Sequence, residues 1–380
     1  MDLFVSCSQG LEPLLIAELQ TLGITASHGF RGVYIKEWSL EAIYKINYLS
    51  RLASRVLYPL ARFRCRHQED LYKEIQKIDW GHTFIQEGSI TKSFAIDANV
   101  SANPELRHSL YAAQVAKDAI CDQLRRKIDQ RPRIDVQNPD VQLNLFISQD
   151  WGVISFDTSG SPLHKRGYRQ ESVEAPIQEN LAAALLQIAQ PQESDVIFDP
   201  CCGSGTFLIE AAMRLSQTPA GYFRKEWGFF HLPFHKEQLW LEIKEQADKG
   251  IQPLQPGKIS GIDNNRQAIH ASKVNIRAAG LHRFLNVECT DFRDYTPSVP
   301  PTFVIANPPF GLRLEEVPHL VPVYRALGDF MKRKMQKPGR GFILTGSPEL
   351  AKEIGLAAEK RHVVFHGGIE CRFLEFNIYE

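Results

Sequence analysis

Four short apolar segments in the second half of the chain are each followed by a longer stretch with helical spacing, and this pattern restricts the fold more than any other feature. The segments are Val196–Phe198, Ile259–Ile262, Phe303–Ala306 and Phe342–Thr345. Strands that alternate with helices form mostly parallel sheets with both faces covered by helices. The sequence therefore predicts an α/β domain, with ligands at the carboxyl ends of its strands.

The first of these strands runs into a glycine-containing turn that opens a helix. The turn reads Asp199-Pro200-Cys201-Cys202-Gly203-Ser204-Gly205-Thr206. Glycines in such a turn let the backbone approach a ligand closely. A dinucleotide-binding turn needs a third glycine where this chain has Leu208, and Asp199 would repel a pyrophosphate. The α-ammonium group of S-adenosylmethionine would be attracted instead, so this cofactor is favoured over a turn without a ligand.

Acidic residues follow two further strand-like segments. Asp263 ends the segment that begins at Ile259. A carboxylate at this place can accept both hydroxyls of a nucleoside ribose, although it could also cap the next helix. Asp291 follows another strand-like run and could accept a hydrogen bond from the adenine amine, with Phe292 against the ring. These residues extend the predicted cofactor site.

The tetrapeptide Asn307-Pro308-Pro309-Phe310 directly follows the segment Phe303–Ala306. Two prolines fix the backbone and remove two N–H donors, so the side-chain oxygen of Asn307 and the carbonyl of Pro308 can accept from one NH₂ group. Phe310 offers a flat surface for a base. This arrangement suits methylation of an exocyclic base amine, which needs orientation more than a strong base.

Two other base chemistries fit the tetrapeptide less well. Deamination of a base needs zinc ligands, and none accompany the motif. Carbon-5 methylation of a pyrimidine needs a cysteine nucleophile, and none lies in or beside the tetrapeptide. A turn without function would be common in isolation, but it is disfavoured after three strand-end signals in order.

Composition excludes some classes of protein and leaves others open. The seven cysteines are an odd number without paired spacing, which favours reduced thiols and no metal site. Basic and acidic residues number 44 each, so RNA binding would have to come from local basic patches. No apolar run approaches the roughly 20 residues that cross a bilayer, and we read no secretory signal at the start. We therefore expect a cytoplasmic protein.

Shorter elements alternate in the first part of the chain. Residues 1–64 follow the β-α-β-β-α-β order of a ferredoxin-like unit. Residues from about 65 to 158 repeat the mixed pattern and end in a predicted hairpin over Gln149-Asp150. The segment Ser159–Pro162 breaks the pattern and marks the clearest domain boundary.

Basic residues gather at two places. Arg125 and Arg126 end a predicted helix, where a solvated helix face is the plainer interpretation. Lys165, Arg166 and Arg169 follow the domain boundary without an acidic residue among them. We expect both groups to contact RNA phosphates, which gives affinity that depends on salt but reads little sequence.

At these motifs the chain resembles a known family. The glycine turn, the two following acids and the Asn-Pro-Pro-Phe tetrapeptide match class I methyltransferases that modify exocyclic amines. Leu163–Arg169, Glu174–Leu186, Gly346–Leu356 and the ending Cys371-Arg372-Phe373 are similar to the THUMP-containing bacterial RNA methyltransferases of the RlmL type, which methylate guanine N2 in 23S rRNA. The similarity spans essentially the whole chain.

The resemblance implies three domains. These are a ferredoxin-like domain over 1–64, a THUMP RNA-binding domain over 65–160 and a Rossmann-like class I methyltransferase domain over 161–380. It implies S-adenosylmethionine as cofactor and structured RNA as partner. The residues expected at the cofactor are Asp199, Cys201, Gly203, Gly205, Thr206, Asp263, Asp291 and Phe292. Those expected at the target amine are Asn307, Pro308, Pro309 and Phe310.

Departures from the family and alternatives to it stay open at this point. Cys202 stands where any small residue is acceptable, and Phe310 stands where relatives often have Tyr. Some relatives carry a second methyltransferase domain behind this one, and we expect that second activity to be absent here. The alternatives are methylation of adenine N6, methylation of guanine N2 in tRNA, and a non-catalytic RNA-binding factor. We expect a monomer that binds neither membrane nor metal.

Overall fold

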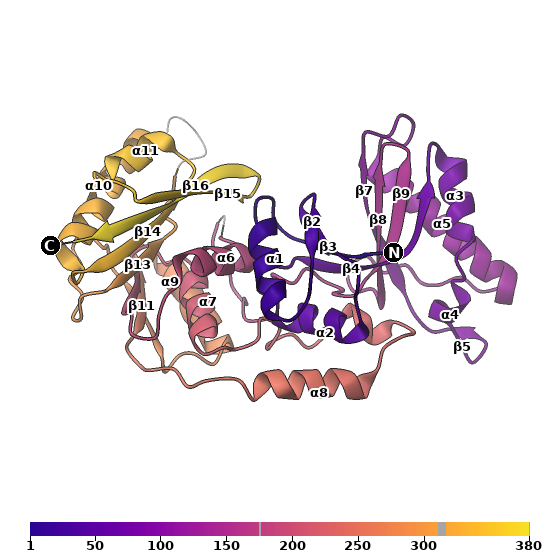
Figure 1. The fold of residues 1–380 in the computed structure, drawn as a ribbon, viewed down its shortest axis with the longest axis horizontal. Helices are drawn as coiled ribbons and strands as arrows, with labels where there is room; N and C mark the ends of the chain where they lie inside the picture. Colours follow the sequence, from indigo (N-terminus) through magenta and orange to yellow (C-terminus); the bar gives the residue numbers. More distant parts are fainter. Residues whose placement is uncertain (175, 311–316, 380) are drawn as a thin grey trace.

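The computed structural model describes residues 1–174, 176–310 and 317–379. These residues form two seven-stranded sheets that follow one another along the long axis of the molecule (Figure 1). Ala175, inside the segment Glu174–Leu186, lies outside the described residues. No helix of the described ranges is long and apolar enough to cross a membrane.

The first sheet begins with the predicted ferredoxin-like order, which is confirmed. Its elements are β1 (Leu3–Ser6), α1 (Glu12–Thr21), β2 (Ser27–Gly29), β3 (Gly32–Ile35), α2 (Leu40–Leu49) and β4 (Arg55–Arg64). The strands lie in the order β2-β3-β1-β4, and every neighbouring pair is antiparallel. Side chains at alternate strand positions, such as Leu3 and Val5, are buried in the core.

The same sheet continues into the next part of the chain because β4 also pairs with β9. The elements here are α3 (Gln68–Gln76), α4 (Gly81–Phe84), β5 (Ile85–Gln86), β6 (Ser89–Ile90), β7 (Phe94–Ser101), α5 (Ser109–Ile128), β8 (Val141–Ser148) and β9 (Trp151–Asp157). The strand order continues as β4-β9-β8-β7, and α3 and α5 lie together on one side (Figure 1). The predicted hairpin is confirmed, since Ser148 lies opposite Trp151.

The second sheet belongs to the α/β part of the chain. Its elements are α6 (Glu179–Ala189), β10 (Ile197–Asp199), α7 (Thr206–Leu215), the 3-10 helix η1 (Gly228–His231), α8 (Glu237–Asp248), β11 (Ile259–Asp263), α9 (Arg266–Ala278), β12 (Leu285–Cys289), β13 (Phe303–Ala306), α10 (Val317–Lys334), β14 (Gly339–Thr345), α11 (Pro348–Glu353), β15 (Lys360–His366) and β16 (Ile369–Ile378).

The strand order of this sheet is β12-β11-β10-β13-β14-β16-β15. The first five strands are parallel, and apolar clusters fill both faces, so the predicted parallel sheet with two covered faces is confirmed. The antiparallel pair β15–β16 was not predicted. Its sequence signal is Gly367-Gly368, two glycines with positive φ between the strands, which is a common hairpin turn.

Three aromatic residues between α7 and β11 pack in the core, namely Trp227, Phe229 and Trp240. Trp240 lies 5.3 Å from Tyr48, and Phe229 lies 4.7 Å from Tyr44, as measured between ring centroids. Both tyrosines belong to α2, so this segment covers the ferredoxin-like part of the first sheet. The packing of these rings leaves them unavailable to line a substrate.

A buried ion pair of the second part of the chain lies at its contact with the first part. Arg166 is 1% exposed, and its guanidinium lies 3.5 Å from the carboxylate of Glu210 on α7. Arg166 also donates to the carbonyl of Arg51, and Arg51 donates to the carbonyl of Thr218 at 2.6 Å. Tyr168 donates to Glu210 at 3.0 Å. This corrects the expectation that Arg166 contacts RNA, because its charge faces Glu210 and not solvent.

The buried pair gives a prediction for stability. Glu210→Ala should lower the free energy of unfolding by about 3–5 kcal/mol, because Arg166 then stays buried without its counter-charge. Chemical denaturation followed by circular dichroism measures the change. Glu41→Ala, which removes an exposed pair with Lys45, is the matched control and should cost less than about 1 kcal/mol. Equal losses of unfolding free energy in the two variants would contradict the assigned burial of the Arg166–Glu210 pair.

Candidate active site

Topology brings the predicted site residues to one edge of the second sheet. β10 lies between β11 and β13, so the chain crosses from one side of β10 to the other before it enters β13. Asp199 and Asp263 are the last residues of β10 and β11, and Asn307 directly follows β13. These strands are parallel, so their carboxyl ends meet at a topological switch point, where open α/β sheets bind ligands.

The glycine turn is held by its own backbone and by Asp263. The N–H of Gly203 donates to the Asp263 carboxylate at 2.9 Å, and the N–H of Gly205 donates to the carbonyl of Cys202 at 2.8 Å. Both glycines have positive φ. A Cβ on Gly205 would lie 2.7 Å from the hydroxyl of Ser272, whereas one on Gly203 would meet only Val173, at 3.9 Å. Gly205 therefore permits close packing on α9, while Gly203 leaves open space beside the turn.

The carboxylate of Asp199 is buried in surroundings that raise its pKa. The residue is 1% exposed, and its carboxylate accepts a hydrogen bond from the N–H of Cys201 at 2.9 Å. Burial, with a smaller contribution from the charge of Asp263, raises the pKa of Asp199 to about 8. No cation pairs with this carboxylate among the described residues. A buried carboxylate in such a place favours a cationic ligand, which would compensate its charge.

The two thiols of the turn are not activated. Burial and the nearby acids raise the pKa values of Cys201 and Cys202 well above the usual value for a thiol. A protonated thiol is a poor nucleophile and a poor metal ligand. Within the described residues there is no group of three or more His, Cys, Asp or Glu side chains that could hold a metal ion.

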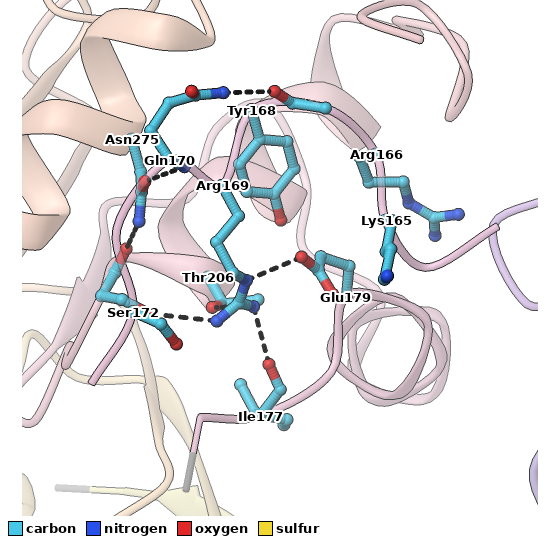
Figure 2. Close-up of polar contacts among 12 residues, drawn as sticks. Lys165, Arg166, Tyr168, Arg169, Gln170, Ser172, Ile177, Glu179, Thr206 and Asn275 are labelled. Atoms are coloured by element: carbon cyan, nitrogen blue, oxygen red, sulfur yellow. Dashed lines mark hydrogen bonds and ion pairs between the residues drawn. The ribbon is translucent and has the colours of Figure 1, made fainter. Parts of the chain in front are cut away.

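Arg169 supports the glycine turn through hydrogen bonds inside the protein, and Figure 2 shows this guanidinium with its partners. It donates to the Glu179 carboxylate at 2.7 Å, to the Ile177 carbonyl at 2.9 Å and to the Thr206 hydroxyl at 3.0 Å. A longer contact, 3.3 Å, reaches the hydroxyl of Ser204. This corrects the expectation that Arg169 holds RNA phosphates, because its donors are used internally. The hydroxyl of Thr206 accepts one of these hydrogen bonds, and the contact of Thr206 with the cofactor stays a prediction.

Two polar residues of α9 complete this support, and the sequence analysis missed both. Asn275 donates to the carbonyls of Ser204, at 3.1 Å, and Glu171, at 2.8 Å. Its side-chain oxygen accepts from the N–H group of Gln170 (Figure 2) and from that of Glu171. Ser272 donates to the carbonyl of Gly203 at 3.1 Å. Their spacing of three residues on an amphipathic helix was the available signal.

Phe292 lies differently from the expectation, whereas the contact of its neighbour Asp291 with adenine stays a prediction. Asp291 follows β12, and Arg293 donates to its two carboxylate oxygens at 2.9 and 2.6 Å. Arg293 lowers the pKa of Asp291 and keeps it ionised. Phe292 is 7% exposed and packs edge-on against Phe330 of α10. The expected contact of the Phe292 ring with adenine is corrected, because this ring belongs to the core.

The Asn-Pro-Pro-Phe tetrapeptide leaves one acceptor unused. The side-chain oxygen of Asn307 is buried and has no hydrogen-bond partner among the described residues. Pro308 is buried and Pro309 is exposed, and neither has an N–H group. Buried polar atoms in folded proteins are nearly always paired, so an unused acceptor marks a place where a ligand can donate.

Phe310 closes this corner of the site. Its ring lies against Gly346, where a Cβ would approach it to 3.0 Å, and 6.3 Å from the His366 ring. Gly346 thus makes room for the aromatic side chain at the end of β14. Lys165, Arg125 and Arg126 are exposed. Their contact with RNA stays a prediction.

Three family models match the chain. The model described as RMKL-like, methyltransferase domain, matches residues 166–375. The THUMP domain model matches residues 65–157, and the RlmL ferredoxin-like domain model matches residues 2–57. These matches confirm the predicted fold class, in which a Rossmann-like methyltransferase domain follows a ferredoxin-like and THUMP module.

Two curated relatives carry the name ribosomal RNA large subunit methyltransferase K/L. The chain is 39% identical to the protein of Syntrophotalea carbinolica over 390 residues, which cover 99% of this chain and 53% of the relative. It is 38% identical to that of Methylococcus capsulatus over 385 residues, which cover 99% and 51%. The chain thus spans about half the length of these relatives.

A solved structure has the same fold over its whole length. It is that of SMU.472, crystallised in complex with SAH. The TM-score is 0.86 at 26% sequence identity, over 100% of this chain and 98% of that protein.

The charge state of Asp199 gives a prediction for pH. Its pKa rises from 3.8 to about 8 on folding, so the folded state binds the proton more tightly than the unfolded state. The stabilisation is complete below about pH 4 and is lost as the pH rises through about 8. Compared with Asp199→Asn, the wild-type protein should therefore lose unfolding free energy between these values, without ligand present.

Denaturant unfolding of both proteins at pH 5, 7 and 9 measures this difference. Asp195→Asn is a suitable control, because Asp195 pairs with Arg340 at 3.1 Å and lies at the opposite end of β10. A difference between wild type and Asp199→Asn that stays constant across this range would contradict the assigned burial of the carboxylate.

Proposed function

Because the chain belongs to the family of RMKL-like methyltransferase domains, we propose that it transfers a methyl group from S-adenosylmethionine to an exocyclic amine of a base in RNA. One observation carries the proposal. The buried oxygen of Asn307 lacks a donor among the described residues, and it lies at the same sheet edge as the buried carboxylate of Asp199. The Asn307 oxygen can accept a hydrogen bond from an amine, and the Asp199 carboxylate can compensate the charge of a cation.

The residues around the glycine turn fit this cofactor. Asp199 would hold the α-ammonium group, and the open side of Gly203 leaves room for a ligand against the backbone. Asp263 would accept from the ribose hydroxyls, and the N–H groups of Gly203 and Asn265 already fix its carboxylate at 2.9 Å each. The relative crystallised with SAH supports this assignment. When bound, the cofactor supplies a methyl group activated by its sulfonium.

The chain itself orients the amine. The side-chain oxygen of Asn307 and the carbonyl oxygen of Pro308 each accept one hydrogen of the NH₂ group, which directs the nitrogen lone pair toward the donor. The two prolines keep these acceptors rigid, and Phe310 provides a face for the base. A base reaches such a pocket only after it leaves its stack. The amine proton passes to solvent after transfer.

The finer proposal is guanine N2 of 23S rRNA. The names of the two curated relatives support RNA of the large ribosomal subunit, and the Asn-Pro-Pro-Phe tetrapeptide supports an exocyclic amine. A ribosomal RNA substrate implies a cytoplasmic enzyme. We retain the boundaries 1–64, 65–160 and 161–380, with the first two domains and Lys165, Arg125 and Arg126 holding RNA. A monomeric state stays a prediction.

Asn307→Ala tests the proposal. The variant should lower the rate of methyl transfer by at least about a hundredfold, because the amine is no longer oriented. Its affinity for S-adenosylmethionine, measured by calorimetry, should stay near that of the wild type. The substrate is 23S rRNA from cells that lack the protein, and a nucleoside digest identifies the product as N2-methylguanosine or N6-methyladenosine.

Asn286→Ala is the matched control for this experiment. Asn286 is an exposed residue of β12 that contacts Glu288, and its loss should leave turnover unchanged. Retained turnover in Asn307→Ala would refute the assigned role of the tetrapeptide. Absence of S-adenosylmethionine binding by the wild type would favour a non-catalytic RNA-binding factor.

A further inference from the structure

Four side chains of the first sheet lie together on one face, which we call the arginine–tryptophan face. They are Arg62 and Arg64 of β4, Trp151 of β9 and Phe146 of β8. Arg64 lies directly opposite Trp151, and both Arg62 and Phe146 lie opposite Val153. Because residues opposite each other in a sheet point to the same side, the four side chains share one surface.

The helices of this part of the chain cover the other face. Phe63, between the two arginines, is buried, and a Cβ on Gly152 would lie 2.5 Å from its ring. Leu145 and Ile147, which flank Phe146, are fully buried in the apolar cluster that also includes Leu71 of α3 and Leu124 of α5. Figure 1 shows these two helices beside the sheet. The alternation therefore places one set of side chains in the core and leaves the arginine–tryptophan face outside it.

Large aromatic rings are exposed on this face. Trp151 is 39% exposed and Phe146 is 42% exposed. The Arg62 guanidinium lies 4.9 Å from the centroid of the Trp151 ring, and that of Arg64 lies 5.4 Å from it. Both arginines are exposed, and within the described residues neither has a carboxylate within 4.0 Å.

The nearby acids are paired with other cations. Asp97 of β7 lies 3.6 Å from Arg55, and Asp150 in the hairpin turn lies 3.7 Å from Arg66. The two arginines at Trp151 therefore keep their charge available beside exposed aromatic rings. In a chain with equal numbers of basic and acidic residues, this local surplus indicates an anionic partner.

We propose that the arginine–tryptophan face binds an unpaired segment of RNA, with bases stacked on Trp151 and Phe146 and phosphates near Arg62 and Arg64. Aromatic rings and guanidinium planes stack on bases of any sequence, and a basic surface follows the backbone. Bases inside a duplex are already stacked and cannot use such a surface. The inference rests on the proposed action on RNA and adds the surface that holds the substrate away from the site.

Fluorescence anisotropy with the full chain tests this inference. The probes are a labelled single-stranded oligouridylate and a labelled RNA duplex of equal length. Trp151→Ala and Phe146→Ala should each weaken binding of the single strand by about tenfold and change duplex binding little. Arg62→Gln with Arg64→Gln should reduce the slope of log affinity against log salt by about 1.4.

Matched variants separate stacking from folding. Trp151→Phe keeps an aromatic ring and should restore binding close to wild type, and circular dichroism checks the fold of each variant. Phe30→Ala removes an exposed ring between β2 and β3, and Arg333→Ala removes an exposed arginine at the end of α10. Neither control should change the affinity.

Three results would overturn the inference. These are wild-type affinity in Trp151→Ala and the arginine double variant, an equal loss of duplex binding, and no binding of single strands by the wild type. The proposed function has a separate readout, because methyl transfer to ribosomal RNA and S-adenosylmethionine binding are measured without these probes. In a protein that does methylate RNA, the Trp151→Ala variant should raise the KM for RNA and leave kcat nearly unchanged.

Discussion

The buried carboxylate of Asp199 is the constraint on which the methyltransferase domain depends. Its burial raises the pKa to about 8, and no cation compensates it among the described residues. A side chain at position 203 could have covered the turn, yet glycine stands there with open space beside it. Ionisation of this carboxylate is thus unfavourable in the protein alone, and a cationic ligand would compensate its charge. Perturbed carboxylates of this kind gather at functional sites, since a structural role alone would favour a neutral residue.

Other residues hold the glycine turn in place because they form hydrogen bonds with its carbonyls and hydroxyl groups. Ser272 and Asn275 bind the carbonyls of Gly203 and Ser204, and Arg169 binds the hydroxyl of Thr206. Arg169 lies three residues after Arg166, which pairs with Glu210 and donates to the carbonyl of Arg51 in the first part of the chain. One short basic segment therefore serves both the glycine turn and the contact with the first sheet. Support of this kind fixes a binding site before the ligand arrives.

Local patterns predicted the parallel sheet and the edge at which Asp199, Asp263 and Asn307 meet. They did not predict side-chain contacts between residues that lie far apart in the sequence. Arg166 and Arg169 have the composition of a basic patch, but Glu210 and Glu179 turn both inward. Phe292 carries no local sign that it packs on α10. The arginine–tryptophan face combines residues from β4 and β9, which become neighbours only when the strand register is known.

Direct contacts connect the two sheets, and this connection affects which RNA the protein would select. The first sheet runs unbroken from β2 to β7, and the Arg51, Arg166 and Glu210 contacts tie it to α7, which follows the glycine turn. The arginine–tryptophan face and Asn307 are thus parts of one connected framework. On the proposed function, an RNA must present an unpaired segment and a target amine at a separation that this framework sets. Because the chain has no net charge, its general attraction to phosphates is weak. It can then select an RNA by the relative positions of the unpaired segment and the target amine.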